Sequence, residues 1–157
     1  MTDRPDNLAI DMFLADRAEA INGKLYVMGG AWDRLQVPEL PGPLPVPISV
    51  AVVITVPWSL TNREFTFSLE LVDVDNAPVP IPQEDGEEGD EGDLFSIPFE
   101  VGRPPGLRQG RPQKNVLSVT IGPGLEFEKP GTYSFRGMID GEELSRATFD
   151  LVTAGPV

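Results

Sequence analysis

The sequence feature that most constrains the fold is the alternation of apolar and polar side chains in several short segments. In residues 64–71, phenylalanine or leucine stands at every second position, with polar residues between them. Successive side chains of a β-strand point to opposite faces, so this spacing predicts a strand with one face in a core. The same alternation recurs at residues 95–101, 117–121, 133–139 and 147–151. The chain is therefore predicted to be all-β.

The segments between these strands carry turn residues. Asn22-Gly23 and Asp140-Gly141 are dipeptides typical of two-residue β-hairpins. Residues 13–20 contain good helix formers, but the Asn-Gly turn that follows favours a strand, with a bulge or a short helical turn around residues 16–19. Pro98 cannot donate a backbone hydrogen bond, which predicts an edge strand or a bulge there.

Residues 48–56 are apolar at positions that belong to both faces of a strand. This pattern predicts a central strand beneath a covering layer. We expect one domain over residues 1–157, an antiparallel β-sandwich of about eight strands. Two long loops interrupt it, a proline-rich one at 38–47, expected to be extended and stiff, and an acidic one at 76–93, expected to be mobile.

Histidine and cysteine are both absent from the chain. Their absence excludes disulfides, thiolate nucleophiles, cysteine-ligated zinc and a Ser-His-Asp triad. It also removes the commonest general base and the commonest metal ligand. Catalysis by carboxylates alone stays open, but nothing in the sequence singles out two of the 25 acidic residues for it. We therefore expect a protein that is not an enzyme.

The formal net charge is −13, and seven of the acidic residues lie in the ten-residue segment 84–93, which contains no base. Such a balance argues against binding to nucleic acid or to an anionic membrane surface and favours basic partners. The first residues lack the pattern of a secretion signal, and the longest apolar run, residues 50–54, is far too short to span a bilayer. We expect a cytoplasmic protein without membrane insertion.

The pair Gly29-Gly30 admits two interpretations. A phosphate-binding loop needs successive backbone N–H groups at a helix start and a nearby cation, and neither is indicated here. Glycines within a strand usually mark a bulge or the close approach of another segment. We expect a kink at which the strand turns a corner or crosses between sheets, with Trp32 as a core or corner aromatic residue.

Carboxylates near strand ends raise the possibility of calcium binding, since Ca²⁺ prefers oxygen ligands. The proposed ligands are Asp73 and Asp75 at one strand end, together with Asp140. The acidic segment 84–93, called the acid run below, would add nonspecific attraction for the cation, although it lacks the spacing of an EF-hand. The alternative is that these acids form a solvated, self-repelling loop, and no other cofactor is expected.

Residues 102–114 form a basic segment that contrasts with the acid run. Its cations are Arg103, Arg108, Arg111 and Lys114, and the acid run contributes Glu87, Glu88 and Asp90 as their counterparts. The basic segment can be an anion or partner site, or a charge complement to the acid run within one chain or between copies. It can equally be a mobile, solvated loop.

The chain also resembles a family of uncharacterised bacterial proteins, common in actinobacteria. The likeness rests on the "NGKL" turn, the "GG-W-DR" segment, the proline-rich loop and the "PGTYSFRGMIDGEEL" ending. It covers nearly the whole sequence. The resemblance implies one compact β domain and no activity, because the family has no assigned catalytic residues.

The sequence thus favours a noncatalytic β-sandwich that acts through protein–protein contact, with another protein or with itself as a homo-oligomer. The alternative function is a β module that binds calcium or a small ligand through loop carboxylates.

Overall fold

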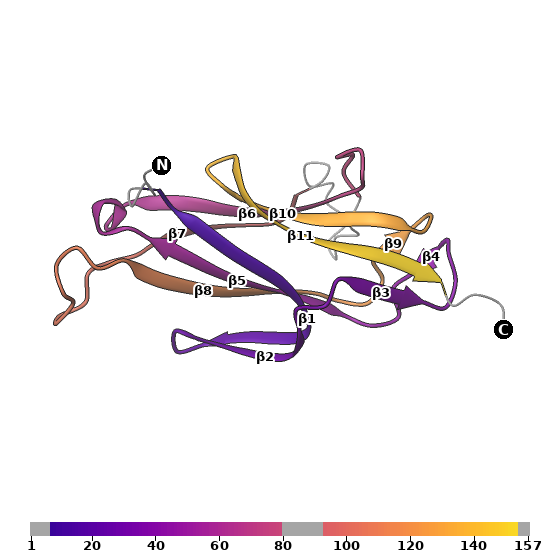
Figure 1. The fold of residues 1–157 in the computed structure, drawn as a ribbon, viewed down its shortest axis with the longest axis horizontal. Coiled ribbons are helices and arrows are strands. Elements are labelled where there is room, and N and C mark those ends of the chain that lie inside the picture. Colours follow the sequence, from indigo (N-terminus) through magenta and orange to yellow (C-terminus); the bar gives the residue numbers. More distant parts are fainter. Residues whose placement is uncertain (1–6, 80–92, 154–157) are drawn as a thin grey trace.

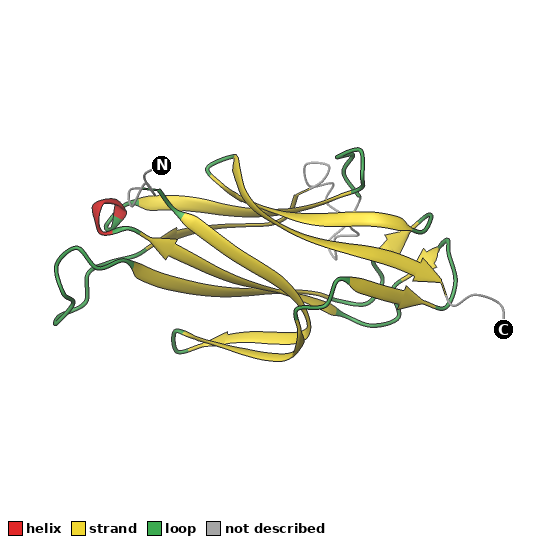
Figure 2. Cartoon of the chain, viewed as in Figure 1, coloured by secondary structure: helices red, strands yellow, loops and turns green. Residues whose placement is uncertain are grey.

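The computed structural model describes residues 7–79 and 93–153, which form two facing β-sheets and a short two-stranded ladder (Figure 1). The first sheet has the order β2 (Lys24–Gly30), β1 (Ala9–Ile21), β5 (Ile48–Val56), β8 (Gln113–Ile121). The second has the order β3 (Arg34–Val37), β11 (Glu142–Thr153), β10 (Gly131–Ile139), β6 (Glu64–Val72), β7 (Asp93–Glu100). The ladder joins β4 (Gly42–Pro43) to β9 (Glu126–Phe127). Across the described ranges, the one helical element is the 3₁₀ turn η1 (Trp58–Leu60), as Figure 2 shows.

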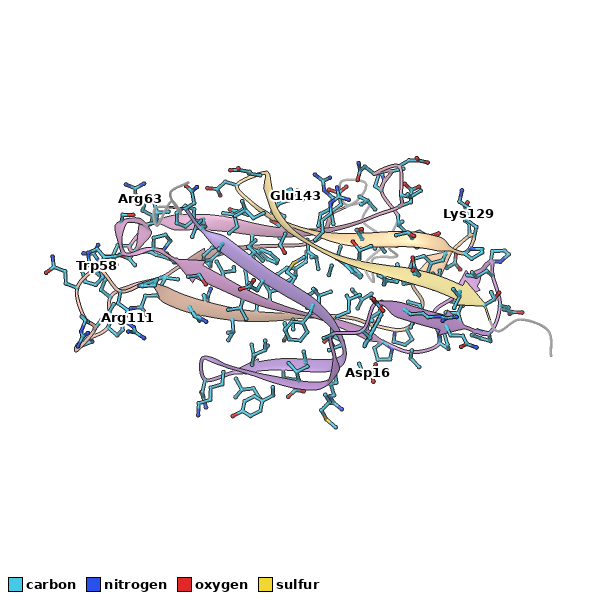
Figure 3. All side chains as sticks on the ribbon, viewed as in Figure 1. Asp16, Trp58, Arg63, Arg111, Lys129 and Glu143 are labelled. Carbon is cyan, nitrogen blue, oxygen red and sulfur yellow. The ribbon has the colours of Figure 1, made fainter. Side chains whose placement is uncertain are left out.

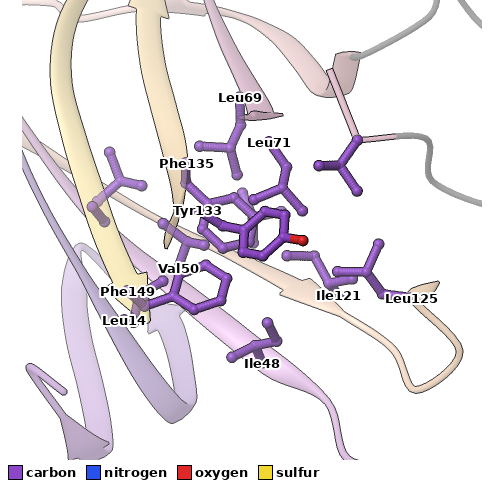
Figure 4. Packing of buried hydrophobic residues seen from close by; sticks show 14 of the residues in the cluster. Leu14, Ile48, Val50, Leu69, Leu71, Ile121, Leu125, Tyr133, Phe135 and Phe149 are labelled. Atoms are coloured by element: carbon purple, nitrogen blue, oxygen red, sulfur yellow. The ribbon is translucent and has the colours of Figure 1, made fainter. Parts of the chain in front are cut away.

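The core lies between the two sheets and is centred on aromatic rings. Phe67, Phe135 and Phe149 are completely or almost completely buried. Phe149 stacks on Phe135 with ring centroids 5.9 Å apart and on Tyr133 at 6.0 Å (Figure 4). Phe127 from the short ladder meets Tyr133 edge-on at 4.8 Å. These contacts join the middle of the second sheet to the end of the sandwich where the β4–β9 ladder lies. The two facing sheets with a core between them confirm the predicted all-β sandwich.

Strand β1 is shared between two pairings. Its first half, from Ala9 to Ala15, pairs with β5, and its second half pairs with β2. The β1–β2 hairpin therefore leaves the sheet and lies beneath its outer face (Figure 1). Ala15 and Ala18 from β1 pack there on Ala51 of β5, with Leu25 of β2 against the same cluster. Small side chains permit this close approach, and the hairpin is the covering layer predicted over β5.

The two glycines lie where β2 ends opposite the bend of β1. Gly29 has a φ of +62°, and a Cβ atom on it would overlap the Asp16 carboxylate. The N–H of Ala31 then donates to the carbonyl of Leu14 at 2.7 Å, and the chain crosses to the second sheet as β3. Trp32, just after the crossing, meets Phe149 edge-on at 6.2 Å. The predicted corner is confirmed.

Three details of the prediction were wrong. The sandwich is not purely antiparallel, because β3 pairs in parallel with β11. The alternation at Leu35 and Val37 indicated a strand after the glycine corner, which is β3, but the two-residue strands β4 and β9 were missed. A two-residue segment shows no alternation, and β4 and β9 pair with each other across a long stretch of sequence. Of the bulge or short helical turn predicted at residues 16–19, the structure shows neither, since β1 is continuous there and its register with β2 does not shift.

The two predicted long loops have different outcomes. The proline-rich loop is fixed by the β4–β9 ladder and by the backbone bond from Leu44 N to Leu125 O at 2.8 Å, and Leu44 is buried. In the acidic loop, the N–H of Val79 donates to Leu71 O at 2.9 Å, so the chain is held to β6 up to that residue. Residues 80–92 lie outside the described residues, and the predicted mobility of the acidic loop falls there.

Strand β7 is an edge strand, as Pro98 predicts. Pro98 pairs with Thr66 of β6. The N–H of Thr66 donates to the Asp140 carboxylate, and its carbonyl accepts from the Asp140 N–H. The backbone of Thr66 therefore points away from β7, so that of Pro98 faces the open edge. A proline in this place blocks the addition of another strand.

We expect Gly29→Ala to lower the free energy of unfolding by about 1–3 kcal/mol, because alanine is strained at this positive φ and its methyl group displaces the Asp16 side chain. The matched control is Gly122→Ala, where an added Cβ meets nothing within 4 Å. Urea unfolding of both variants measures the difference. Equal stability of the two would contradict the role given to Gly29.

Candidate functional site

Two connections between the sheets meet at one end of the sandwich. One runs from β5 through η1 to β6, and the other is the segment 101–112 between β7 and β8 (Figure 1). A backbone hydrogen bond of 2.7 Å from Asn62 N to Val101 O joins them. Five cationic side chains belong to this end, which we call the basic end: Arg63, Arg103, Arg108, Arg111 and Lys114. Figure 3 shows Trp58, Arg63 and Arg111 together there.

Arg103 is fixed in place by three contacts with the η1 connection. Its Nε donates to the hydroxyl of Thr61 at 2.6 Å, and its NH2 nitrogen donates to the carbonyl of Trp58 at 2.9 Å. The guanidinium carbon lies 3.9 Å from the centre of the Trp58 ring. The Thr61 hydroxyl donates in turn to Trp58 O at 2.7 Å. A planar guanidinium suits this combination of stacking and hydrogen bonding, and an ammonium group does not.

The other cations of the basic end are exposed. Within the described part of the chain, none of the five forms an ion pair. Residues 101–115 contain no acid, and the nearest carboxylates along the paired strands are Glu64 and Glu100, which face each other across β6 and β7. A chain with a net charge of −13 thus gathers five of its 12 cations in one place.

A cleft of about 480 Å³ opens at the basic end, lined by residues 100–104 on one side and 113–115 on the other. Arg103 and Lys114 both line it, together with Glu100. Gln113, also in the lining, has a buried side-chain nitrogen without a hydrogen-bond partner in the described structure. The two cations favour a ligand rich in acceptors, such as a carboxylate.

The predicted partners of the basic segment are not placed. Glu87, Glu88 and Asp90 lie outside the described residues, so no contact between the acid run and the basic end is observed. Of the predicted cations, the structure brings Arg103 and Lys114 to one cleft and leaves Arg108 and Arg111 on the adjoining loop. Sequence reasoning missed Trp58 and Arg63, because only the fold brings the η1 connection against residues 101–103.

The proposed calcium ligands do not come together. One Asp73 oxygen accepts from the backbone N–H groups of Asp75 and Ala77, at 2.8 and 3.0 Å, which closes the turn after β6. Asp140 is engaged with Thr66 near the other end of β6, about 23 Å away along the strand. The part of the chain that the structure describes contains no group of three carboxylates suited to a metal ion. Asp73, Asp75 and Asp140 therefore do not form one metal site in the described structure.

A second polar cluster, which sequence reasoning missed, lies on the outer face of the second sheet. One Glu143 oxygen accepts from Arg136 Nε and from Arg146 Nε, both at 2.7 Å, and Arg136 also reaches Glu70 at 3.4 Å. Burial raises the pKa of Glu143, but hydrogen bonds and charge attraction from the two arginines outweigh it and hold the pKa below its ordinary value. Each ion is paired, so this cluster stabilises the sheet rather than forming a binding site.

Tyr133 is the other residue with a shifted pKa. Burial raises the pKa of its hydroxyl, and the negative charges of Asp73 and Glu128 raise it further. The hydroxyl donates to Lys129 O at 2.7 Å. It stays protonated and has a structural role in the core.

We expect Arg103→Ala to lower the free energy of unfolding by about 1–2 kcal/mol, because two charged hydrogen bonds and the Trp58 stack are lost. Arg103→Lys should restore only part of this, while Arg108→Ala, on the same loop, should change stability by less than about 0.5 kcal/mol. Urea unfolding followed by tryptophan fluorescence measures all three. Identical curves for the two alanine variants would refute the stabilising role given to Arg103.

Glu143→Gln tests the second cluster through pH. The stabilisation from the lowered pKa is fully present above the ordinary value of 4.5 and is lost as the pH falls through the lower folded value. We therefore expect this variant to be less stable than the parent at neutral pH, and we expect this difference in stability to disappear in acid. The control Glu142→Gln removes the same charge at the adjacent residue. In thermal melts from neutral pH to pH 3, its difference in stability from the parent should not shrink in this way.

No helix in the described ranges has the length and apolar character needed to cross a membrane. Among curated proteins, none matches the chain. A family model described as "Family of unknown function (DUF6941)" matches residues 10–152, which spans both sheets and the basic end. The chain therefore belongs to this family of unknown function.

Proposed function

We propose that this protein is a noncatalytic binding module that acts through protein–protein contact, and that its basic end docks an acidic stretch of the partner. The observation that carries the proposal is the group of five cations that have no ion pair in the described structure. Exposed charges of one sign attract a partner of the opposite sign and speed its association. The cytoplasmic location expected from the sequence is part of the proposal.

The geometry of the basic end supports binding at one defined site rather than nonspecific electrostatic attraction. Arg103 is held by Thr61 and Trp58, so part of the ordering cost of binding is met before the partner arrives. The cleft beside it offers Lys114 as a further donor. A carboxylate in that cleft can bond with several donors at once. The absence of histidine and cysteine supports the noncatalytic part of the proposal.

Binding of fluorescent hexaglutamate, followed by anisotropy, tests the proposal. We expect binding that weakens steeply between about 50 and 300 mM salt, because exposed charges are screened. The double variant Arg108→Glu/Arg111→Glu should weaken it by about tenfold or more, equivalent to about 1.4 kcal/mol. The matched control is Lys24→Glu/Lys129→Glu, which changes the net charge equally at exposed positions outside the basic end.

Two results would overturn the proposal. One is the absence of hexaglutamate binding at low salt. The other is an equal loss in both double variants, which would show that the net charge matters and the basic end does not.

A further inference from the structure

The β1–β2 hairpin carries an exposed apolar surface. Six large hydrophobic side chains are exposed in the part of the chain that the structure describes, and four of them belong to this hairpin: Ile21, Tyr26, Val27 and Met28. Tyr26 is 55% exposed and Met28 is 70% exposed. Scattered apolar residues on a surface are ordinary, whereas a group of them on one strand indicates a surface that meets another molecule.

We propose that this surface binds a second copy of the chain through antiparallel pairing of the two β2 strands about a two-fold axis. The hairpin is separate from the basic end, and the inference goes beyond the proposed function. Pairing of this kind joins the two four-stranded sheets into one continuous sheet.

The backbone of β2 is open on one side. This strand is an edge of the first sheet, and Figure 1 shows it at the margin of the molecule. The two-residue turn at 22–23 places Lys24 opposite Ile21, and a β-turn bonds these two residues to each other. Hydrogen bonds to β1 then alternate along β2, so the N–H and C=O groups of Leu25 and Val27 point to the open side. They are available to another strand.

The other three sheet edges are less suited to such pairing. Strand β7 carries Pro98, whose position blocks the addition of a strand. Strand β3 has only four residues. Strand β8 is long enough, but its exposed side chains are Lys114 and Thr120. Only β2 combines an open backbone with exposed apolar side chains among these four edges.

Charge favours contact between copies at the hairpin. The chain has a net charge of −13, so two identical chains repel each other overall. Residues 15–30, in contrast, contain two acids and two bases and are neutral as a group. Two hairpins can therefore approach closely with little repulsion between them.

The hairpin is also complementary to itself. A two-fold axis at right angles to two antiparallel strands gives both copies the same hydrogen bonds, as a closed dimer requires. When the axis passes near Val27, Tyr26 of one copy lies beside Met28 of the other. Cross-strand contacts between an aromatic ring and a thioether are favourable. Both exposed side chains are thereby covered.

Sedimentation over a range of protein concentrations tests the inference with two variants. Val27→Pro removes an N–H that points to the open side and leaves the bonds to β1 intact. Tyr26→Ser/Met28→Ser keeps the backbone and removes the apolar contact. We expect the parent to dimerise with a dissociation constant that changes less than about threefold between 50 and 500 mM salt, because the contact is not ionic. Each variant should raise that constant by about tenfold or more.

Matched controls separate the interface from general effects on folding. Ser96→Pro places a proline on β7 two residues from Pro98, where the N–H also faces an open edge. Val46→Ser/Val74→Ser removes two exposed apolar side chains outside the hairpin. Both controls should dimerise like the parent.

A parent that stays monomeric up to about 1 mM protein would overturn the inference. So would a dimer that both β2 variants leave intact. The variant Arg108→Glu/Arg111→Glu should dimerise normally, and the β2 variants should bind hexaglutamate normally. Failure of this inference is therefore distinguishable from failure of the proposed function.

Discussion

The burial of β5 on both of its faces is the constraint on which the rest of the structure depends. One face of this strand packs into the aromatic core between the sheets, and the other lies beneath the β1–β2 hairpin. A single sheet-on-sheet contact covers only one face of a strand. The chain covers the second face by dividing β1, whose residue Ala15 pairs with Ser49 of β5 and with Gly30 of β2. The bend, the glycine corner and the crossing to β3 follow from that division.

Much of this fold was predictable because local chemistry and tertiary packing agree. Alternation located the long strands, and Asn22-Gly23 and Asp140-Gly141 adopt the positive φ angles that their hairpins require. The two-residue strands β4 and β9 were not predictable, and the alternation at Leu35 and Val37 indicated a strand but not its parallel pairing with β11. The predicted count of about eight strands therefore corresponds to the longer strands. The parallel pair in the second sheet was not predicted, because the prediction paired only strands that are neighbours in sequence.

The site was predictable where it is local in sequence. Arg103, Arg108, Arg111 and Lys114 stand out because no acid accompanies them. The role of Arg103 was hidden, since its partners Thr61 and Trp58 lie about 40 residues earlier. The same limit explains the calcium hypothesis, which joined Asp73 and Asp140 as strand-end carboxylates. Antiparallel pairing of β6 with β10 sends those two ends in opposite directions.

The parallel pairing of β3 with β11 has a consequence for how the chain acquires its structure during synthesis. Residues 34–37 are made long before the strand that they pair with, which also supplies Phe149 to the core. Contacts between segments so distant in sequence are slow to form. A ribosome-bound chain that has not yet released β11 therefore lacks one side of its core and carries Trp32 without its aromatic neighbour. The core of this domain is therefore complete only once β11 is available, and until then apolar surface on its strands stays exposed.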